Sequence, residues 1–259
     1  MKLTVIMPVF NGAQTVSRAV ASVGRLSSLM DGELRMIAVD DCSTDDTHPI
    51  LMTLKARHPF LEVLRLPRNG GPGPARNHAL DQVSEGWIGF IDADDEIIAE
   101  PYADVLRRGE HLNRDFITFN GYFISEDTVA RKYDFERIAD DRRLMAKTSL
   151  RSELDGSVIF SIYHSKLVQA HDLRFGRDFY EDIVFSNLGL ILAERRLILN
   201  AYCYKKHWSG ISIVNTVSER HIKGLLGAIV DLRNRLLEKG LYGADLSDDF
   251  AYGAHGLST

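Results

Sequence analysis

Short apolar runs alternate with amphipathic stretches along the first 120 residues of the chain. Five of these runs predict buried strands, over residues 3–10, 34–39, 61–66, 87–91 and 116–119. Between the runs, apolar residues recur at helical spacing, as with Val16, Ala19, Val20 and Val23. Strands that alternate with helices predict an α/β fold in which a mainly parallel sheet is flanked by helices.

Helix start signals lie between the predicted strands. Ser43 and Asp46 stand three residues apart and predict a capping box for the helix after the second strand. Pro74 and Pro101 are each expected to open a helix, because proline suits the first helical turn.

The second half of the chain has a different pattern. Residues 126–147 hold 12 charged side chains in 22, which predicts a solvated insertion or a mobile flap. Order is expected to return over 157–163, with a helix after Phe179 and a strand over 197–205. Residues 216–240 predict an amphipathic helix, whose apolar positions are Ile222, Leu225, Leu226, Ile229, Leu236 and Leu237.

Composition narrows the class of protein. The 259 residues carry 31 basic and 36 acidic side chains, a formal net charge of −5, so the chain has no general attraction for nucleic acid. Cys42 and Cys203 are too few for a disulfide framework or a cysteine-rich zinc site, and they fit a reducing cytosol. We expect no signal peptide and no membrane span, because no apolar run approaches roughly 18 residues.

Two acidic clusters follow predicted strands. Residues 40–46 contain four aspartates, although a turn and a helix N-cap would need only one. Residues 92–96 read DADDE directly after the fourth strand, where packed carboxylates repel one another. Mg²⁺ or Mn²⁺ would relieve that repulsion, so Asp-x-Asp in this place predicts a metal-bound nucleoside diphosphate. The motif by itself is short and matches many proteins by chance.

Three further segments have both a structural and a functional interpretation. Residues 68–77 contain three glycines, Pro74 and Arg76, which suit a helix start that binds anions or a plain flexible loop. Residues 179–182 place two acids before an apolar helix, where the helix dipole alone favours them. Residues 204–212 carry basic and hydroxyl groups that suit phosphate binding or a solvated loop.

Taken together, these segments are more specific than any one of them. The ordered motifs are VIMPVFN at 5–11, VDDCSTD at 39–45, NGG with ARN at 69–71 and 75–77, FIDADD at 90–95 and YED at 180–182. In this order they closely resemble the family 2 glycosyltransferases, inverting enzymes with the GT-A fold. The resemblance is dense over residues 3–100 and ordered to about residue 215. It implies a hexosyltransferase-type enzyme of the kind used in bacterial surface-polysaccharide assembly.

The resemblance implies a role for each matching residue. Asp182 would be the general base that deprotonates the acceptor hydroxyl, with Glu181 beside it. The donor nucleotide would lie against Pro8, Val9, Asn11, Asp40, Asp41, Arg76, Asp92, Ala93, Lys205 and Ser212. A Mn²⁺ or Mg²⁺ ion on the diphosphate would be held by Asp94, Asp95 and His207.

The same resemblance implies partners and a layout. The donor would be a nucleotide sugar, with UDP favoured, and the acceptor a glycan or a lipid-linked molecule. Residues 1–120 would bind the donor, 121–215 would form the acceptor side with the catalytic base, and 216–259 would be a C-terminal helix and tail. We expect a cytoplasmic protein at the inner face of the membrane, which the C-terminal helix could touch unless it packs on the core.

Three other classes share parts of this pattern. A nucleotidyltransferase would carry a glycine-rich basic loop after the first strand, and PVFNG at 8–12 has none. A degenerate sugar-binding module would not need a base such as Asp182 beside Asp92 and Asp94. A phosphatase of the haloacid dehalogenase type places its Asp-x-Asp after the first strand, whereas here the motif follows the fourth.

Overall fold

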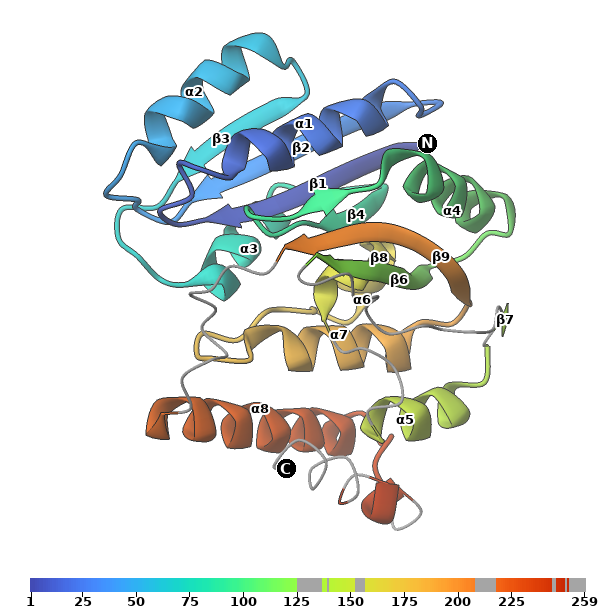
Figure 1. Cartoon of the computed structure of the whole chain (residues 1–259). Helices are drawn as coiled ribbons and strands as arrows, with labels where there is room; N and C mark the ends of the chain where they lie inside the picture. Colours follow the sequence, from blue (N-terminus) through green and yellow to red (C-terminus); the bar gives the residue numbers. More distant parts are fainter. Residues whose placement is uncertain are drawn as a thin grey trace.

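In the computed structural model, the described strands from all parts of the chain form one sheet. The structure describes residues 1–124, 137–138, 140–151, 157–207, 218–243, 246–249 and 251. Within these residues the sheet has nine strands, eight of them in the order β3-β2-β1-β4-β8-β6-β9-β5, while β7 pairs with β9. Helices cover both of its faces (Figure 1). The predicted α/β architecture is therefore confirmed.

The first half of the sheet is parallel, as predicted. It contains β1 (Lys2–Val9), β2 (Glu33–Asp40), β3 (Leu61–Arg65) and β4 (Trp87–Phe90). β1 pairs in parallel with β2 and β4, and β2 pairs in parallel with β3. Their carboxyl ends point to the same edge, on the left in Figure 1.

Beyond β4 the sheet is mixed, which the strand pattern did not predict. β8 (Ser161–His164) lies antiparallel between β4 and β6 (Phe116–Ile124), although it follows β6 in sequence. β9 (Arg196–His207) pairs in parallel with β6 and antiparallel with two-residue strands, β5 (Glu96–Ile97) and β7 (Arg137–Ile138). The predicted division at residue 120 falls inside β6 and stays a prediction.

The helices form two layers on the sheet and a further layer outside it. α1 (Val16–Ser27), α2 (Thr47–Arg57) and α4 (Ala99–His111) cover the upper face in Figure 1. The opposite face carries α3 (Pro72–Leu80), α6 (Ser165–Ala170) and α7 (Glu181–Leu192), with a 3₁₀ turn at Val158–Phe160. α5 (Arg142–Leu150) and α8 (Glu219–Glu238) pack on the outer side of α7.

Several predicted boundaries were wrong for local reasons. The Ser43 capping box does not form, because Asp46 is the N-cap residue of α2 and its side chain makes no cap hydrogen bond. α3 begins at Pro72 and α4 at Ala99, each two residues before the predicted proline. Part of the predicted charged insertion forms α5, which buries Met145, Ala146 and Leu150; residues 126–136 of that insertion lie outside the described residues.

α8 confirms the predicted C-terminal helix but not all of its buried positions. Leu232 and Leu236 are buried, on the helix that contacts α7. Ile222 and Leu226 remain 52% and 57% exposed, so the apolar stripe is wider than the face that packs. None of the helices in the described ranges is both long enough and apolar enough to cross a bilayer.

One close contact fixes α3 against the start of α7. A Cβ atom on Gly73 would lie 2.0 Å from the carbonyl oxygen of Gly176 and 3.1 Å from Cβ of Glu181. Asn77, one turn later, donates to the carbonyl of Phe175 and accepts from its N–H, at 3.0 and 2.9 Å. The lack of a side chain at Gly73 therefore lets the start of α3 lie against the start of α7.

We predict that Gly73→Ala lowers the free energy of unfolding by about 1–3 kcal/mol, because the new methyl group overlaps backbone atoms. Gly227→Ala is the matched control, since Gly227 lies inside α8 and a Cβ atom added there would have no neighbouring atom within 4 Å. It should raise the free energy of unfolding by about 0.5–1 kcal/mol through helix propensity. Urea unfolding measures both, and a neutral Gly73→Ala would contradict the packing.

Candidate functional site

The loops at the carboxyl edge of the sheet contain strained backbone. Asn11, Cys42 and Tyr180 adopt left-handed conformations with φ of 51°, 61° and 63°. A non-glycine residue has a conformational cost there, so such residues concentrate where the surroundings enforce a geometry. These three lie after β1, after β2 and at the N-cap of α7.

The loop after β1 is fastened to the loop after β2. Pro8 and Val9 are buried at the end of β1. The Asn11 side-chain oxygen accepts hydrogen bonds from the Thr44 N–H at 2.9 Å and hydroxyl at 3.2 Å, and the Asn11 N–H donates to Ser43 Oγ at 3.0 Å. The amide of Asn11 is therefore used to hold the two loops in place.

Asp40 and Asp41 are both buried, and both bind protein groups. Asp40 Oδ1 accepts from the Ser43 N–H at 2.8 Å, while Oδ2 lies 3.2 Å from Arg65 Nε. Asp41 accepts from the N–H groups of Gly70 and Gly71, at 2.9 and 2.7 Å. Asp41 thus anchors the glycine loop before α3, while contact of either aspartate with a nucleotide base stays a prediction.

The aspartates of the DADDE segment (residues 92–96) differ in how deeply they are buried. Asp95 is 1% exposed, and its two oxygens accept from the His207 N–H at 2.7 Å and the Tyr204 hydroxyl at 2.8 Å. Burial, with the charges of Asp92 and Asp94 added, raises the pKa of Asp95 to about 8. Asp92, Ala93 and Asp94 are half-buried. Burial and the charge of Asp92 also raise the pKa of Asp94.

Tyr204 connects the end of β9 to the DADDE segment. Its buried hydroxyl donates to Asp95 and accepts from the Asp92 N–H at 3.0 Å. No sequence pattern predicts this role, because a tyrosine in a strand normally indicates only packing.

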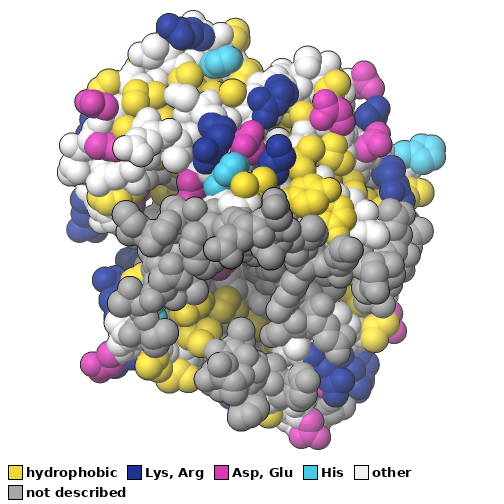
Figure 2. All heavy atoms as spheres, in the orientation of Figure 1, with side chains coloured by type: hydrophobic (Ala, Val, Ile, Leu, Met, Phe, Trp, Pro, Cys, Tyr) yellow, Lys and Arg dark blue, Asp and Glu magenta, His cyan; other side chains and the backbone are white. Residues whose placement is uncertain are grey.

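The remaining predicted residues of β9 lie close by. Lys205 and His207 are half-buried, and His207 Nε2 lies 2.9 Å from Glu96 Oε1. Glu96 also pairs with Arg18 and Arg25, at 3.8 and 3.2 Å. Basic, acidic and histidine side chains are mixed in this way on the upper half of the face in Figure 2. Ser212 lies outside the described residues.

Arg76 links the loop after β4 to the helix that carries the predicted base. Its side chain is 5% exposed and donates to Asp92 Oδ1 at 2.9 Å and to Glu181 Oε1 at 2.6 Å. Burial alone would lower the pKa of Arg76, but the carboxylates of Asp92, Glu181 and Asp182 raise it. The guanidinium also lies 5.3 Å from the centre of the Phe175 ring.

Asp182 follows Glu181 in the first turn of α7. One of its oxygens accepts a long hydrogen bond, 3.4 Å, from the Val158 N–H. Burial and the negative charge of Glu181 raise the pKa of Asp182 to about 6, against the opposing effect of Arg76. A carboxylate with this pKa is ionised at neutral pH and is a stronger base than an ordinary aspartate.

A cavity of about 570 Å³ lies beside Arg76 and the start of α7. Arg76, Asp92, Glu181 and Asp182 line it together with the glycine loop at Gly70 and Gly71. The cavity is also lined by four residues that the sequence did not predict: Arg177, Asp178, Arg220 and His221. Arg220 and His221 could not be predicted from a local motif, because they reach the cavity only through the packing of α8 on α7.

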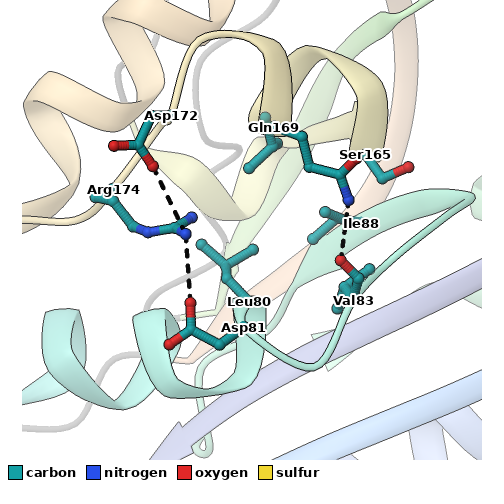
Figure 3. Close-up of a pocket in the computed structure, with 9 residues that line it drawn as sticks. Leu80, Asp81, Val83, Ile88, Ser165, Gln169, Asp172 and Arg174 are labelled. Carbon is teal, nitrogen blue, oxygen red and sulfur yellow. Dashed lines mark hydrogen bonds and ion pairs between the residues drawn. The ribbon is translucent and has the colours of Figure 1, made fainter.

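A second cavity of about 280 Å³ shares no lining residue with the first. Figure 3 shows Arg174 between Asp81 and Asp172, at 3.3 and 3.6 Å, and Gln169 donating to the carbonyl of Val83. These contacts connect the end of α3 to α6 and the residues after it, and the cavity contains none of the predicted site residues.

The residues fit a metal that is shared with a ligand. Across the described residues, no three His, Cys, Asp or Glu side chains converge on one point as a complete metal site. Asp94 is half-buried and close enough to Asp92 for that charge to raise its pKa. Such a pair suits Mg²⁺ or Mn²⁺ that takes its other ligands from phosphate and water.

The fold and the site together define an α/β protein of the GT-A type. A family model described as glycosyl transferase family 2 matches residues 4–171, and the chain belongs to this family. The resemblance that the motifs predicted is confirmed.

Two relatives show how similar this chain is to characterised glycosyltransferases. The GalNAc(5)-diNAcBac-PP-undecaprenol beta-1,3-glucosyltransferase of Campylobacter jejuni is 24% identical over 180 residues, which are 69% of this chain and 56% of that protein. The poly(ribitol-phosphate) beta-N-acetylglucosaminyltransferase TarS of Staphylococcus aureus is 27% identical over 213 residues, which are 79% of this chain and 35% of that protein. This chain therefore spans only part of the length of each relative.

Solved structures confirm the GT-A fold. The crystal structure of S. aureus TarS 1-349 superposes with a TM-score of 0.77 at 22% identity, covering 98% of this chain and 70% of that one. The mannosyltransferase PcManGT from Pyrobaculum calidifontis, in complex with GDP-Man and Mn²⁺, gives a TM-score of 0.65 at 15% identity, covering 98% and 69%.

We predict that Tyr204→Phe lowers the free energy of unfolding by about 1–3 kcal/mol, because two buried polar groups lose their shared partner. Tyr202→Phe on the same strand is the control, since its hydroxyl makes no hydrogen bond within the described residues. Thermal unfolding of both variants measures the difference, and equal effects would mean that the Tyr204 hydroxyl does not hold the segment.

Proposed function

We propose that the chain transfers a sugar from a nucleoside-diphosphate sugar, with UDP favoured, to a hydroxyl group of an acceptor, with inversion at the anomeric carbon. The observation that carries the proposal is the pair of hydrogen bonds from Arg76 to Asp92 and Glu181. Through them a nucleotide-side carboxylate and the acidic start of α7 border one cavity. A carboxylate in this cavity whose pKa is raised to about 6 supports a catalytic base over a binding module.

The donor nucleotide is assigned to the carboxyl edge of β1–β4. Pro8 and Val9 border the base and ribose, and Asp92 accepts from ribose hydroxyls. Asn11, Asp40, Asp41 and Ala93 shape the loops around the base rather than forming most of the contacts. Support comes from the internal hydrogen bonds of Asn11, Asp40 and Asp41, and from Asp92, which lines the cavity.

Asp94 is the residue that we assign to a divalent metal on the diphosphate. Such an ion, Mn²⁺ or Mg²⁺, would neutralise charge on the leaving diphosphate when bound. Asp95 is assigned a positioning role, because both of its oxygens already accept hydrogen bonds. His207 is a weaker ligand candidate, since its Nε2 faces Glu96. Lys205, and Ser212 beyond the described residues, are proposed to border the diphosphate.

The chemical step is assigned to Asp182. Its carboxylate takes the proton of the acceptor hydroxyl while that oxygen attacks the anomeric carbon from the face opposite the diphosphate. One displacement inverts the configuration and needs no covalent intermediate. Arg76 pairs with Glu181 at 2.6 Å, so that Asp182 is the carboxylate left to accept the proton.

The acceptor class is taken by analogy from the relatives. Their names include an undecaprenol-linked glycan and poly(ribitol-phosphate), which supports a glycan or lipid-linked acceptor in surface-polysaccharide assembly. On the same analogy we propose that the reaction takes place in the cytoplasm at the inner face of the membrane, with peripheral contact.

We predict that Asp182→Asn lowers the transfer rate by at least about 100-fold, because the amide cannot accept the proton. UDP affinity should stay within about twofold, since the proposal places Asp182 on the acceptor side of the site. The measurement is the rate of UDP release, with Asp172→Asn, an exposed residue, as the control. Equal loss of binding and transfer would reject the assignment as base.

The transfer rate should depend on pH through Asp182. Its pKa is raised to about 6, and a base acts only when deprotonated, so the rate should be constant above about pH 7. It should fall about tenfold per unit below pH 5. A rate that stays unchanged from pH 5 to 8 at saturating substrate would contradict this role.

A further inference from the structure

Beside Asp182 the main cavity has a mouth built from two elements. We define the mouth as residues 177–180, which precede α7, with Arg220 and His221 from the first turn of α8; all of them line the cavity. The Phe179 ring stacks on the His221 ring with centroids 4.0 Å apart, and the Arg220 guanidinium lies 5.1 Å from the same ring centre. The starts of α7 and α8 lie one below the other in Figure 1.

The proposed reaction assigns the mouth to the acceptor. The nucleotide-side carboxylates lie on the loop after β4, whereas Asp182 lies on α7. The attacking hydroxyl must reach Asp182 from the side opposite the leaving diphosphate. Residues 177–180 run directly into the turn that carries Asp182, so the acceptor atoms around that hydroxyl meet the mouth.

The charge of the mouth is suited to an anion. Within the described residues, Arg177 and Arg220 form no ion pair with any carboxylate. Glu219, the acidic neighbour of Arg220, pairs with Lys223 at 2.6 Å. Among the residues that define the mouth, Asp178 is the single carboxylate, against two arginines.

Arg220 is also held in position. Its contact with Phe179 fixes the guanidinium by a cation–π interaction. The Arg220 guanidinium makes no hydrogen bond within the described residues, so its N–H groups can bind oxygen atoms of a ligand. His221 Nε2, in the same mouth, is buried and makes no hydrogen bond within the described residues.

We propose that Arg177 and Arg220 bind an anionic group, a phosphate or a carboxylate, that the acceptor carries close to the attacked hydroxyl. This inference rests on the proposed transfer reaction for its assignment to the acceptor. It makes the acceptor an anionic glycan, and it makes the two arginines determinants of acceptor specificity.

Calorimetric titration with three probes tests the proposal: methyl glucoside, its 6-phosphate, and methyl glucuronide. Each is titrated into the wild-type chain with UDP and Mn²⁺ present. At least one charged probe should bind about tenfold more tightly than the neutral one, because charge-assisted hydrogen bonds are strong. Which of the two charged probes binds better identifies the anion as phosphate or carboxylate.

Arg177→Gln and Arg220→Gln should each remove most of that preference. Arg233→Gln is the matched control, because Arg233 lies on the same helix, is exposed and also contacts an aromatic ring, at 5.3 Å from the Tyr242 centroid. It should leave the preference unchanged. Equal binding of the three probes, or an equal loss in Arg233→Gln, would overturn the proposal.

Asp94→Ala separates this inference from the proposed function. When the probes are titrated into Asp94→Ala without nucleotide, a mouth that binds anions should still prefer the charged probe. When UDP is titrated into the same variant, metal-dependent binding should be lost. If UDP fails to bind the wild-type chain while the charged probe binds through both arginines, the transfer reaction fails and the anion site stands. If the preference disappears with Asp94, the charged probe was binding at the nucleotide site, and the mouth assignment is wrong.

Discussion

A single buried guanidinium holds the two sides of the site together. Arg76 donates to Asp92 after β4 and to Glu181 at the start of α7. A buried cation is tolerated only when it is paired, so both carboxylates must stay where the guanidinium can reach them. The distance between the proposed nucleotide site and the proposed base therefore depends on one side chain of α3. The close contact at Gly73 and the Asn77 hydrogen bonds keep α3 in the position that this requires.

The aspartates of the site divide into two groups by what they contact. Asp40, Asp41 and Asp95 are buried, and their hydrogen bonds to nearby backbone and side chains define the loops. Asp94 and Asp182 are only half-buried, so their carboxylates are available to a ligand. Sequence motifs record both groups as aspartate, although the first shapes the site and the second is proposed to perform its chemistry.

Much of the first half of the fold could be predicted from the sequence, because each buried strand there pairs with neighbours fixed by the βαβ rule. The insertion of β8 between β4 and β6 could not, since antiparallel pairing at long range leaves no local pattern. Ordered motifs did predict residues that lie together, as with Arg76, Asp92 and Asp182, which line one cavity. Tyr204 and Arg220 were missed, because their roles depend on which distant element they pack against.

Calorimetric titration of UDP, GDP, CDP and ADP, each with Mn²⁺ and then with EDTA, tests the central claim most directly, because it needs neither the sugar nor the acceptor. We expect one diphosphate, UDP, to bind the wild-type chain in a metal-dependent way and to lose that dependence in Asp94→Ala. Absence of binding by all four diphosphates, or identical binding with EDTA, would contradict a nucleotide-sugar site at the carboxyl edge of this sheet.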